Sequence, residues 1–161
     1  MKKAFLFIIV LFTFISCEED ISFNNPSFQG VKDNVFWRAI ASTASLGVNG
    51  DLIIKGYSGN EVITLKTTST VKGTYSLGTG DSNTAVYELT DASGTLTFAT
   101  GLGEADGQIV ITDYDIENNT ISGTFKFNAE NSYNNPLAGA VVNFQQGVFY
   151  KVPIIAQASV N

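Results

Sequence analysis

The stretch TISGTFKF, residues 120–127, carries the clearest strand signal in this chain, because its apolar residues recur at even spacings. Ile121, Phe125 and Phe127 fall on one side of an extended chain, and polar residues such as Lys126 fall on the other. Successive side chains of a β-strand point to opposite faces of the sheet. The stretch therefore predicts a strand with one buried face and one solvent-facing face.

The same period of two continues through most of the chain, and no stretch has a convincing helical period. Turn signals separate the apolar runs, and the connections are too short for the crossovers that parallel strands need. We therefore expect an all-β fold: a single antiparallel β-sandwich or a flattened β-barrel, which differ in strand tilt and register. The pattern predicts about ten short strands, at residues 35–41, 52–55, 62–66, 74–77, 85–89, 95–98, 108–113, 120–127, 141–144 and 148–152.

The first sixteen residues have the composition of a secretory signal peptide. Lys2 and Lys3 form a positive start, and residues 4–14 form an apolar run of eleven residues, interrupted by one threonine. That run is shorter than the roughly 20 residues that a membrane-spanning helix needs. The segment Phe14-Ile15-Ser16-Cys17 resembles the lipobox of bacterial lipoproteins, with phenylalanine in place of the usual leucine.

Cleavage before Cys17 defines the expected domain organisation. Residues 1–16 are the lipoprotein signal peptide, residues 17–34 are the lipidated cysteine with a flexible acidic tether, and residues 35–161 are the antiparallel β domain. Cys17 is the only cysteine, so its lipidation leaves no thiol for a disulfide. Several acyl chains on one residue give a stable membrane anchor, which a single chain does not.

Several pieces of the chain together carry a family resemblance. They are Cys17 with the acidic residues after it, the early strand with Trp37, and the stretches GTYSL, GQIVITDYD, ISGTFKFNA and VNFQQGVFYKVPI. In these the chain resembles the small, β-rich, uncharacterised lipoproteins of Bacteroidota, a family with a domain of unknown function. The resemblance implies an antiparallel β domain on a lipid anchor, and it implies no activity.

The acidic triplet Glu18-Glu19-Asp20 is a candidate export signal. It resembles the acidic run that, in lipoproteins of this bacterial group, directs export to the outer face of the outer membrane. The resemblance therefore implies an outer membrane lipoprotein exposed at the cell surface. The alternative is that the charges only keep the tether solvated.

The charge balance argues against nucleic acid as a partner. The chain has nine basic and fifteen acidic residues, and removal of Lys2 and Lys3 leaves seven basic residues and a formal charge of −8. Such a surface repels phosphate backbones and anionic headgroups.

The sequence offers little catalytic machinery. It contains no histidine, which removes the commonest general base and the Ser-His and Cys-His pairs. The segment Gly101-Leu102-Gly103-Glu104 lacks the third glycine of a dinucleotide-binding loop and no helical pattern follows it. We therefore expect no enzyme activity and no cofactor.

One segment has the residue types of a metal site. Asp113, Asp115, Glu117 and Asn119 place oxygen atoms at alternate positions, as the start of an EF-hand calcium loop does. The twelfth position is Thr124 instead of the bidentate glutamate, and strands are predicted on both sides. The segment is a weak calcium candidate, and we favour a solvated hairpin turn rich in local Asp and Asn hydrogen bonds, with no metal.

The expected function is therefore that of a monomeric, membrane-anchored, non-catalytic binding or interaction module, with a protein or glycan partner left open. Trp37 and the six tyrosines are candidates for a sugar-binding platform, although Trp37 shares a predicted face with Val35 and Ala39, which favours a place in the core. The alternative function is a carrier that holds a small apolar ligand inside a barrel cavity. A solid core would favour the module, and a cavity lined by Phe and Ile would favour the carrier.

Overall fold

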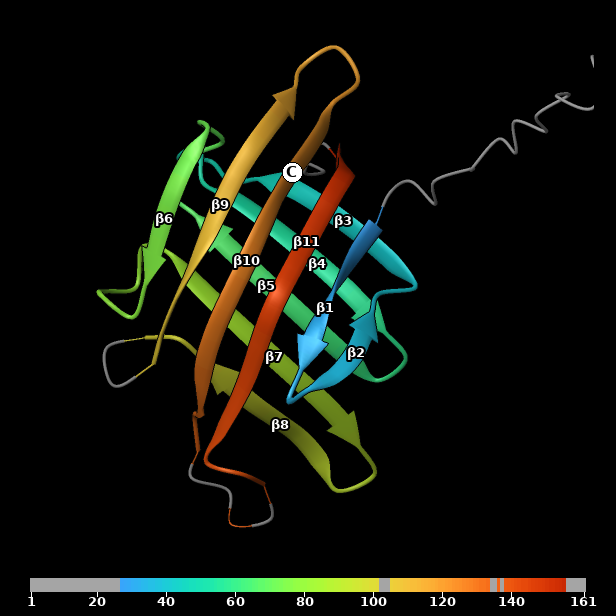
Figure 1. Cartoon of the computed structure of the whole chain (residues 1–161), viewed down its shortest axis with the longest axis vertical. Coiled ribbons are helices and arrows are strands. Elements are labelled where there is room, and N and C mark those ends of the chain that lie inside the picture. The colour runs from blue at the N-terminus through green and yellow to red at the C-terminus, as the bar shows by residue number, and fades with distance from the viewer. Residues whose placement is uncertain (1–26, 102–104, 134–135, 137, 156–161) are drawn as a thin grey trace, which may run out of the picture.

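A computed structural model describes residues 27–101, 105–133, 136 and 138–155. All regular secondary structure in these residues is β-strand (Figure 1). Across the same residues there is no helix with the length and hydrophobicity to span a bilayer. The strands are β1 (Ser27–Lys32), β2 (Val35–Arg38), β3 (Ala41–Leu46), β4 (Leu52–Ser58), β5 (Glu61–Thr67), β6 (Gly73–Leu77), β7 (Thr84–Asp91), β8 (Gly94–Ala99), β9 (Asp106–Asp115), β10 (Thr120–Asn131) and β11 (Val141–Ile155).

The strands form two layers that face each other (Figure 1). The front sheet has the order β6-β9-β10-β11-β1-β2, and the back sheet has the order β3-β4-β5-β7-β8. The layers join at two corners, where Ile154 of β11 pairs with Ala44 of β3 and Glu130 of β10 pairs with Ala99 of β8. Since β10 and β11 also pair with each other, the strands close into a ring. The all-β, mostly antiparallel prediction is confirmed, and the only parallel pairing among the described strands is β11 with β3.

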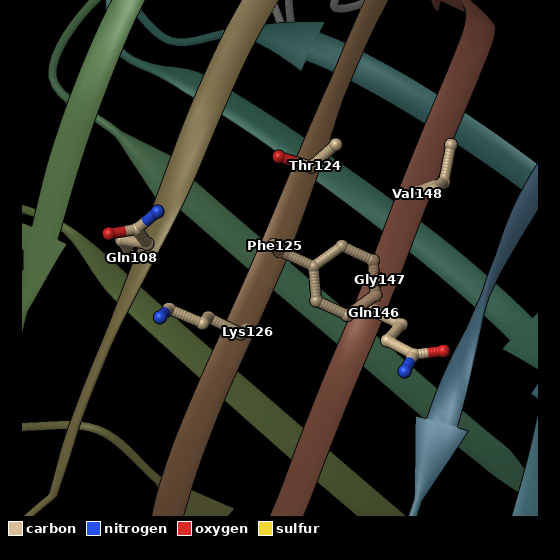
Figure 2. A pocket seen from close by; sticks show the side chains of 7 residues that line it. All are labelled: Gln108, Thr124, Phe125, Lys126, Gln146, Gly147 and Val148. Carbon is tan, nitrogen blue, oxygen red and sulfur yellow. The ribbon is translucent and has the colours of Figure 1, made fainter.

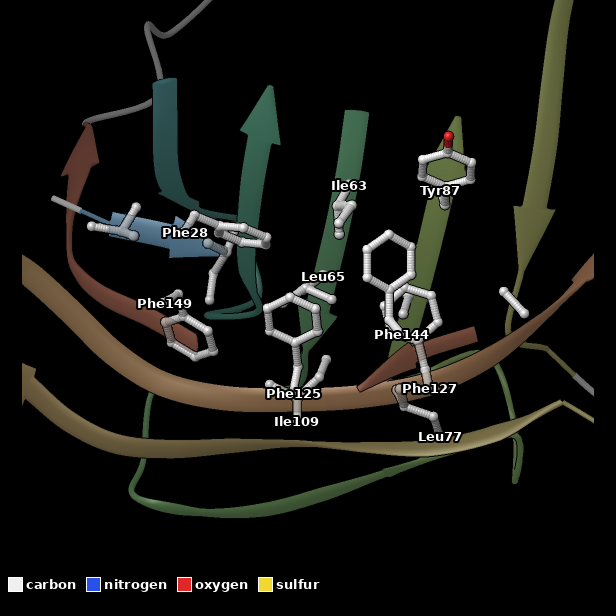
Figure 3. Close-up of a cluster of buried hydrophobic side chains, with 14 of the residues drawn as sticks. Phe28, Ile63, Leu65, Leu77, Tyr87, Ile109, Phe125, Phe127, Phe144 and Phe149 are labelled. Atoms are coloured by element: carbon white, nitrogen blue, oxygen red, sulfur yellow. The ribbon is translucent and has the colours of Figure 1, made fainter. Parts of the chain in front are cut away.

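The space between the layers is filled by aromatic and branched side chains (Figure 3). The rings of Phe28 and Phe125 have centroids 5.1 Å apart, and those of Phe127 and Phe144 are 4.9 Å apart. Full burial of one such side chain is worth about 1.5–3 kcal/mol. The predicted inward face of residues 120–127 is confirmed, because Ile121, Phe125 and Phe127 are all buried. Trp37 is also buried, at 5% exposed, but Val35, which was predicted to share its inward face, is 66% exposed at the start of the edge strand β2.

The β domain begins earlier than the sequence suggests. Residues 17–34 were expected to form a flexible tether, but β1 lies within them and pairs with β11 on one side and β2 on the other. The cause is Phe28, which is buried against the rings of Trp37 and Phe125. An isolated phenylalanine in a polar segment is a weak strand signal, and only its partners make it part of the core.

The predicted first strand, residues 35–41, is interrupted at the point where the chain changes sheets. The backbone N–H of Ala39 donates to the carbonyl of Phe28 in the front sheet, at 2.8 Å. The next N–H, that of Ile40, donates to the carbonyl of Tyr57 in the back sheet, at 2.7 Å. At the other end of the chain, the two predicted strands 141–144 and 148–152 are one strand, β11, which continues through two bulges.

Candidate functional site

An open depression lies on the outer face of the front sheet, the side turned away from the back sheet (Figure 2). Its volume is about 300 Å³, at the small end of the range of about 300–1,000 Å³ typical of ligand pockets. Strands β9, β10 and β11 supply its lining, which consists of Gln108, Thr124, Phe125, Lys126, Gln146, Gly147 and Val148.

A β-bulge in β11 forms this depression. Phe125 of β10 pairs with Gly147, but Phe127, two residues on, pairs with Phe144, three residues back along β11. The bulge adds one residue to β11 between Phe144 and Gly147. Within it, Gln146 has a φ of 53°, which lies in the left-handed region. Glutamine rarely adopts this conformation, and a bulge changes the direction in which nearby side chains point.

Gly147 gives the depression its floor. A Cβ atom at this position would lie 2.6 Å from ring carbons of Phe125, so no side chain fits between the ring and the strand. The ring of Phe125 therefore lies directly under the backbone of β11, as Figure 2 shows. With the partly exposed Val148, it makes the floor apolar.

The rim of the depression is polar and has no partner within the protein. In the part of the chain that the structure describes, the side chains of Gln108, Thr124, Lys126 and Gln146 make no hydrogen bond or ion pair. Two amides, one hydroxyl and one ammonium group are thus available as donors and acceptors. The lining offers amide, hydroxyl and ammonium groups beside apolar side chains, which together can hold a ligand by hydrogen bonds and apolar contact.

A second polar cluster lies between the layers and joins the β1–β2 hairpin to the back sheet. Glu61 at the start of β5 accepts hydrogen bonds from Lys32, from Tyr87 and, at 2.6 Å, from Nε1 of Trp37. Lys32 Nζ also donates to the hydroxyl of Tyr87 at 2.8 Å. The carboxylate and ammonium side chains are only 17% and 24% exposed.

The pKa values in this cluster indicate a structural role. Burial by itself would raise the pKa of Glu61, but the hydrogen bonds from Lys32, Tyr87 and Trp37 outweigh burial and hold the pKa below its ordinary 4.5. Burial and the adjacent Glu61 carboxylate raise the pKa of Tyr87, so its hydroxyl keeps its proton and donates it. Every charged group of the cluster therefore has its partners within the protein.

The calcium candidate forms the hairpin turn between β9 and β10. The carboxylate of Asp115 accepts two hydrogen bonds from Asn118, from the backbone N–H at 3.0 Å and the side-chain amide at 2.7 Å. Asp113 instead pairs with Lys72 at 2.8 Å. Among the described residues, no group of three or more acidic, histidine or cysteine side chains is placed to hold a metal ion. Weak or absent calcium binding remains a prediction.

The remaining site residues predicted from the sequence either lie outside the described residues or are spread over different parts of the fold. Cys17 and the triplet Glu18-Glu19-Asp20 lie outside the described residues. The proposed aromatic platform does not assemble, because Trp37 and Tyr87 are buried whereas Tyr133 and Tyr150 are exposed.

A family model described as a domain of unknown function, DUF6252, matches residues 24–153. The chain belongs to the DUF6252 family. No curated protein and no solved structure matches the chain. The matched residues include β1, which therefore belongs to the DUF6252 domain and not to the tether. They also include the bulge at Gln146.

Sequence reasoning missed the depression of this DUF6252 domain, although a signal for it is present. The inward positions of β11 are Val142 and Phe144, then Gly147 and Phe149, then Val152. Inward residues of a regular strand are two positions apart, as Val142 and Phe144 are. The step from Phe144 to Gly147 is three positions, and so is the step from Phe149 to Val152, because a bulge inserts one extra residue at each of these points. The cluster around Glu61 has no such signal, because its members are distant in sequence.

Replacing Gln146 with Gly should raise the free energy of unfolding of the DUF6252 domain by about 0.5–1 kcal/mol. The change relieves the left-handed backbone of a non-glycine residue, and part of that gain is offset by the flexibility of glycine in the unfolded chain. The neighbour Gln145, which has no positive φ, is the matched control, and Gln145→Gly should lower stability by a similar amount. Urea unfolding would measure both, and a shift of both variants in the same direction would contradict the strain at Gln146.

Proposed function

We propose that this protein is a non-catalytic binding module, anchored through a lipid on Cys17 and exposed at the surface of the outer membrane, that holds its ligand in the depression on the front sheet. The observation that carries the proposal is the polar rim of the depression. Four side chains there, Gln146 among them, have no partner within the described residues, and the backbone of Gln146 is held at a φ of 53°, in the left-handed region. Strain of this kind is retained mostly where a site uses it.

The packing of the core supports a module more than a carrier. Phe144 of the front sheet contacts the rings of Trp37, Phe125 and Phe127 in its own sheet and the ring of Tyr87 in the back sheet. An apolar ligand would have to displace these rings, whereas a ligand on the outer face displaces only water.

Filling the depression tests the binding site. Thr124→Trp places a large ring on its rim, and the matched control Thr64→Trp makes the same change on the outer face of the back sheet, between the buried Ile63 and Leu65. We expect Thr124→Trp to weaken binding to an immobilised panel of polysaccharides and peptides at least about tenfold, and the control to leave it unchanged. Binding that survives Thr124→Trp, or that both variants lose equally, would place the site elsewhere.

The anchor and the surface location are tested in cells. Cys17→Ala should release the protein from the membrane fraction or leave its signal uncleaved, because the lipid attachment point is lost. Replacing Glu18, Glu19 and Asp20 with Ala should leave the protein in the membrane fraction but protected from protease added to whole cells. If that triple variant is digested as readily as the parent, the acidic run is not an export signal.

A further inference from the structure

The basic residues of the domain are divided between paired and unpaired positions. Residues 27–155 contain seven lysines and arginines, and three of them form ion pairs: Lys32 with Glu61, Lys66 with Asp51 and Lys72 with Asp113. The four without an ion pair among the described residues are Arg38, Lys55, Lys126 and Lys151. Three of these four belong to strands of the front sheet, and only Lys55 belongs to the back sheet.

Two of these charges flank the depression. Lys126 lines it directly (Figure 2). Arg38 ends a row of paired residues that crosses the sheet through Gln29 and Val148 to Thr124 on the rim. Three strand spacings of about 4.8 Å place Arg38 about 14 Å from Thr124. The exposed Arg38 follows the buried Trp37, so its position in the strand is on the outer face.

Lys151 adds a third positive charge, on β11 and nearer the C-terminal end of that strand than the depression. Its Nζ lies 5.5 Å from the ring centroid of the exposed Tyr150. The acidic residues of the front-sheet strands all lie near the ends of β9 and β10. They are Asp106, Asp113, Asp115 and Glu130. Lys126 is therefore the basic residue in the middle of the outer face, with Arg38 on the edge strand β2 and Lys151 toward the end of β11, in a chain whose net charge is −6.

From this distribution we infer that the outer face of the front sheet binds a linear polysaccharide that carries carboxylate groups along its length, such as a polyuronate. The inference rests on the proposed function and names its ligand class. Amide and hydroxyl side chains match sugar hydroxyl groups, the exposed Val148 offers an apolar contact to the face of a sugar ring, and Lys126 and Arg38 match separated carboxylates.

Nucleic acid fits this surface poorly. Duplex DNA carries one charge per about 1.7 Å of axis, and its binding usually depends on several phosphate contacts. A face with three dispersed basic side chains on an acidic protein neutralises few of these charges and repels the remainder.

The test is calorimetric titration of the full-length protein, purified in detergent, with polygalacturonate and with the same polymer after complete methyl esterification. We expect polygalacturonate to bind and the neutral ester to bind at least about fivefold more weakly. Lys126→Gln should weaken binding of polygalacturonate by a similar factor. The matched control Lys55→Gln, an unpaired lysine on the back sheet, should not change it.

Three outcomes would overturn the acidic polysaccharide as ligand: no binding of polygalacturonate, equal binding of the ester, or tighter binding of single-stranded oligothymidylate. Equal loss of affinity in the Lys126→Gln and Lys55→Gln variants would also overturn the acidic polysaccharide as ligand. Such a result would mean that the affinity depends on the net charge of the protein and not on a lysine in the depression. If the ester binds as well as the acid and Thr124→Trp removes that binding, the ligand class is wrong but the proposed binding site stands.

Discussion

Phe125→Asp should abolish folding. The side chain is 2% exposed, and its ring contacts those of Phe28, Phe127 and Phe144. Loss of a large aromatic side chain from a core costs about 3–5 kcal/mol, and burial of an unpaired carboxylate adds several kcal/mol. Together these approach or exceed the total stability of a typical domain, about 5–15 kcal/mol.

The next residue provides the control. Lys126 is exposed on the outer face and has no ion pair among the described residues, so Lys126→Asp should change the free energy of unfolding by no more than about 0.5 kcal/mol. Thermal melts followed by circular dichroism would compare the two variants. Equal stability of Phe125→Asp and Lys126→Asp would mean that the register of β10 is wrong.

Glu61→Ala should be the most destabilising change to a polar side chain, with a loss of about 2–4 kcal/mol. Removal of the carboxylate leaves the ammonium of Lys32 without its ion-pair partner and the indole N–H of Trp37 without an acceptor. The cost of breaking a buried pair is about 3–5 kcal/mol, reduced here because Lys32 and Glu61 keep some contact with solvent. Chemical denaturation would measure the loss.

Glu88 is the matched control for Glu61. It lies on β7, the strand that pairs with β5, and no hydrogen bond or ion pair within the described residues involves its side chain. Glu88→Ala should therefore change stability by no more than about 0.5 kcal/mol. A loss at Glu88 as large as that at Glu61 would show that the cluster has no special role.

The contribution of Glu61 should depend on pH in a defined direction. Its pKa in the folded protein is below the ordinary 4.5, so the folded state favours the ionised form. The resulting stabilisation is present above pH 4.5 and is lost as the pH falls through the lower, folded-state value. The difference in unfolding free energy between the parent and Glu61→Gln should therefore be larger at pH 7 than at pH 3. A constant difference across this range would exclude a lowered pKa.

Most of the strands, and the buried face of most of them, could be predicted from the sequence alone, whereas β1 was predicted to be part of the tether. The alternation around Phe125 and Phe127 is local information, because successive side chains on a strand point to opposite faces whatever the strand pairs with. The same alternation placed Trp37 correctly in the core, but it also placed Val35 there, and Val35 is exposed because β2 is an edge strand. The spacing of three between Phe144 and Gly147 also lay in the sequence, although its meaning as a bulge became evident only beside β10.

Only the tertiary structure decided the order of strands, the closure of the ring and the composition of both polar sites. Ring closure depends on the pairing of Ile154 with Ala44, which are far apart in the chain. Likewise Lys32, Glu61 and Tyr87 meet because β5 and β7 are neighbours in the back sheet and β1 belongs to the front sheet that faces it. Contacts of this kind are set by sheet twist and register, which sum over many residues, so no short segment of sequence encodes them.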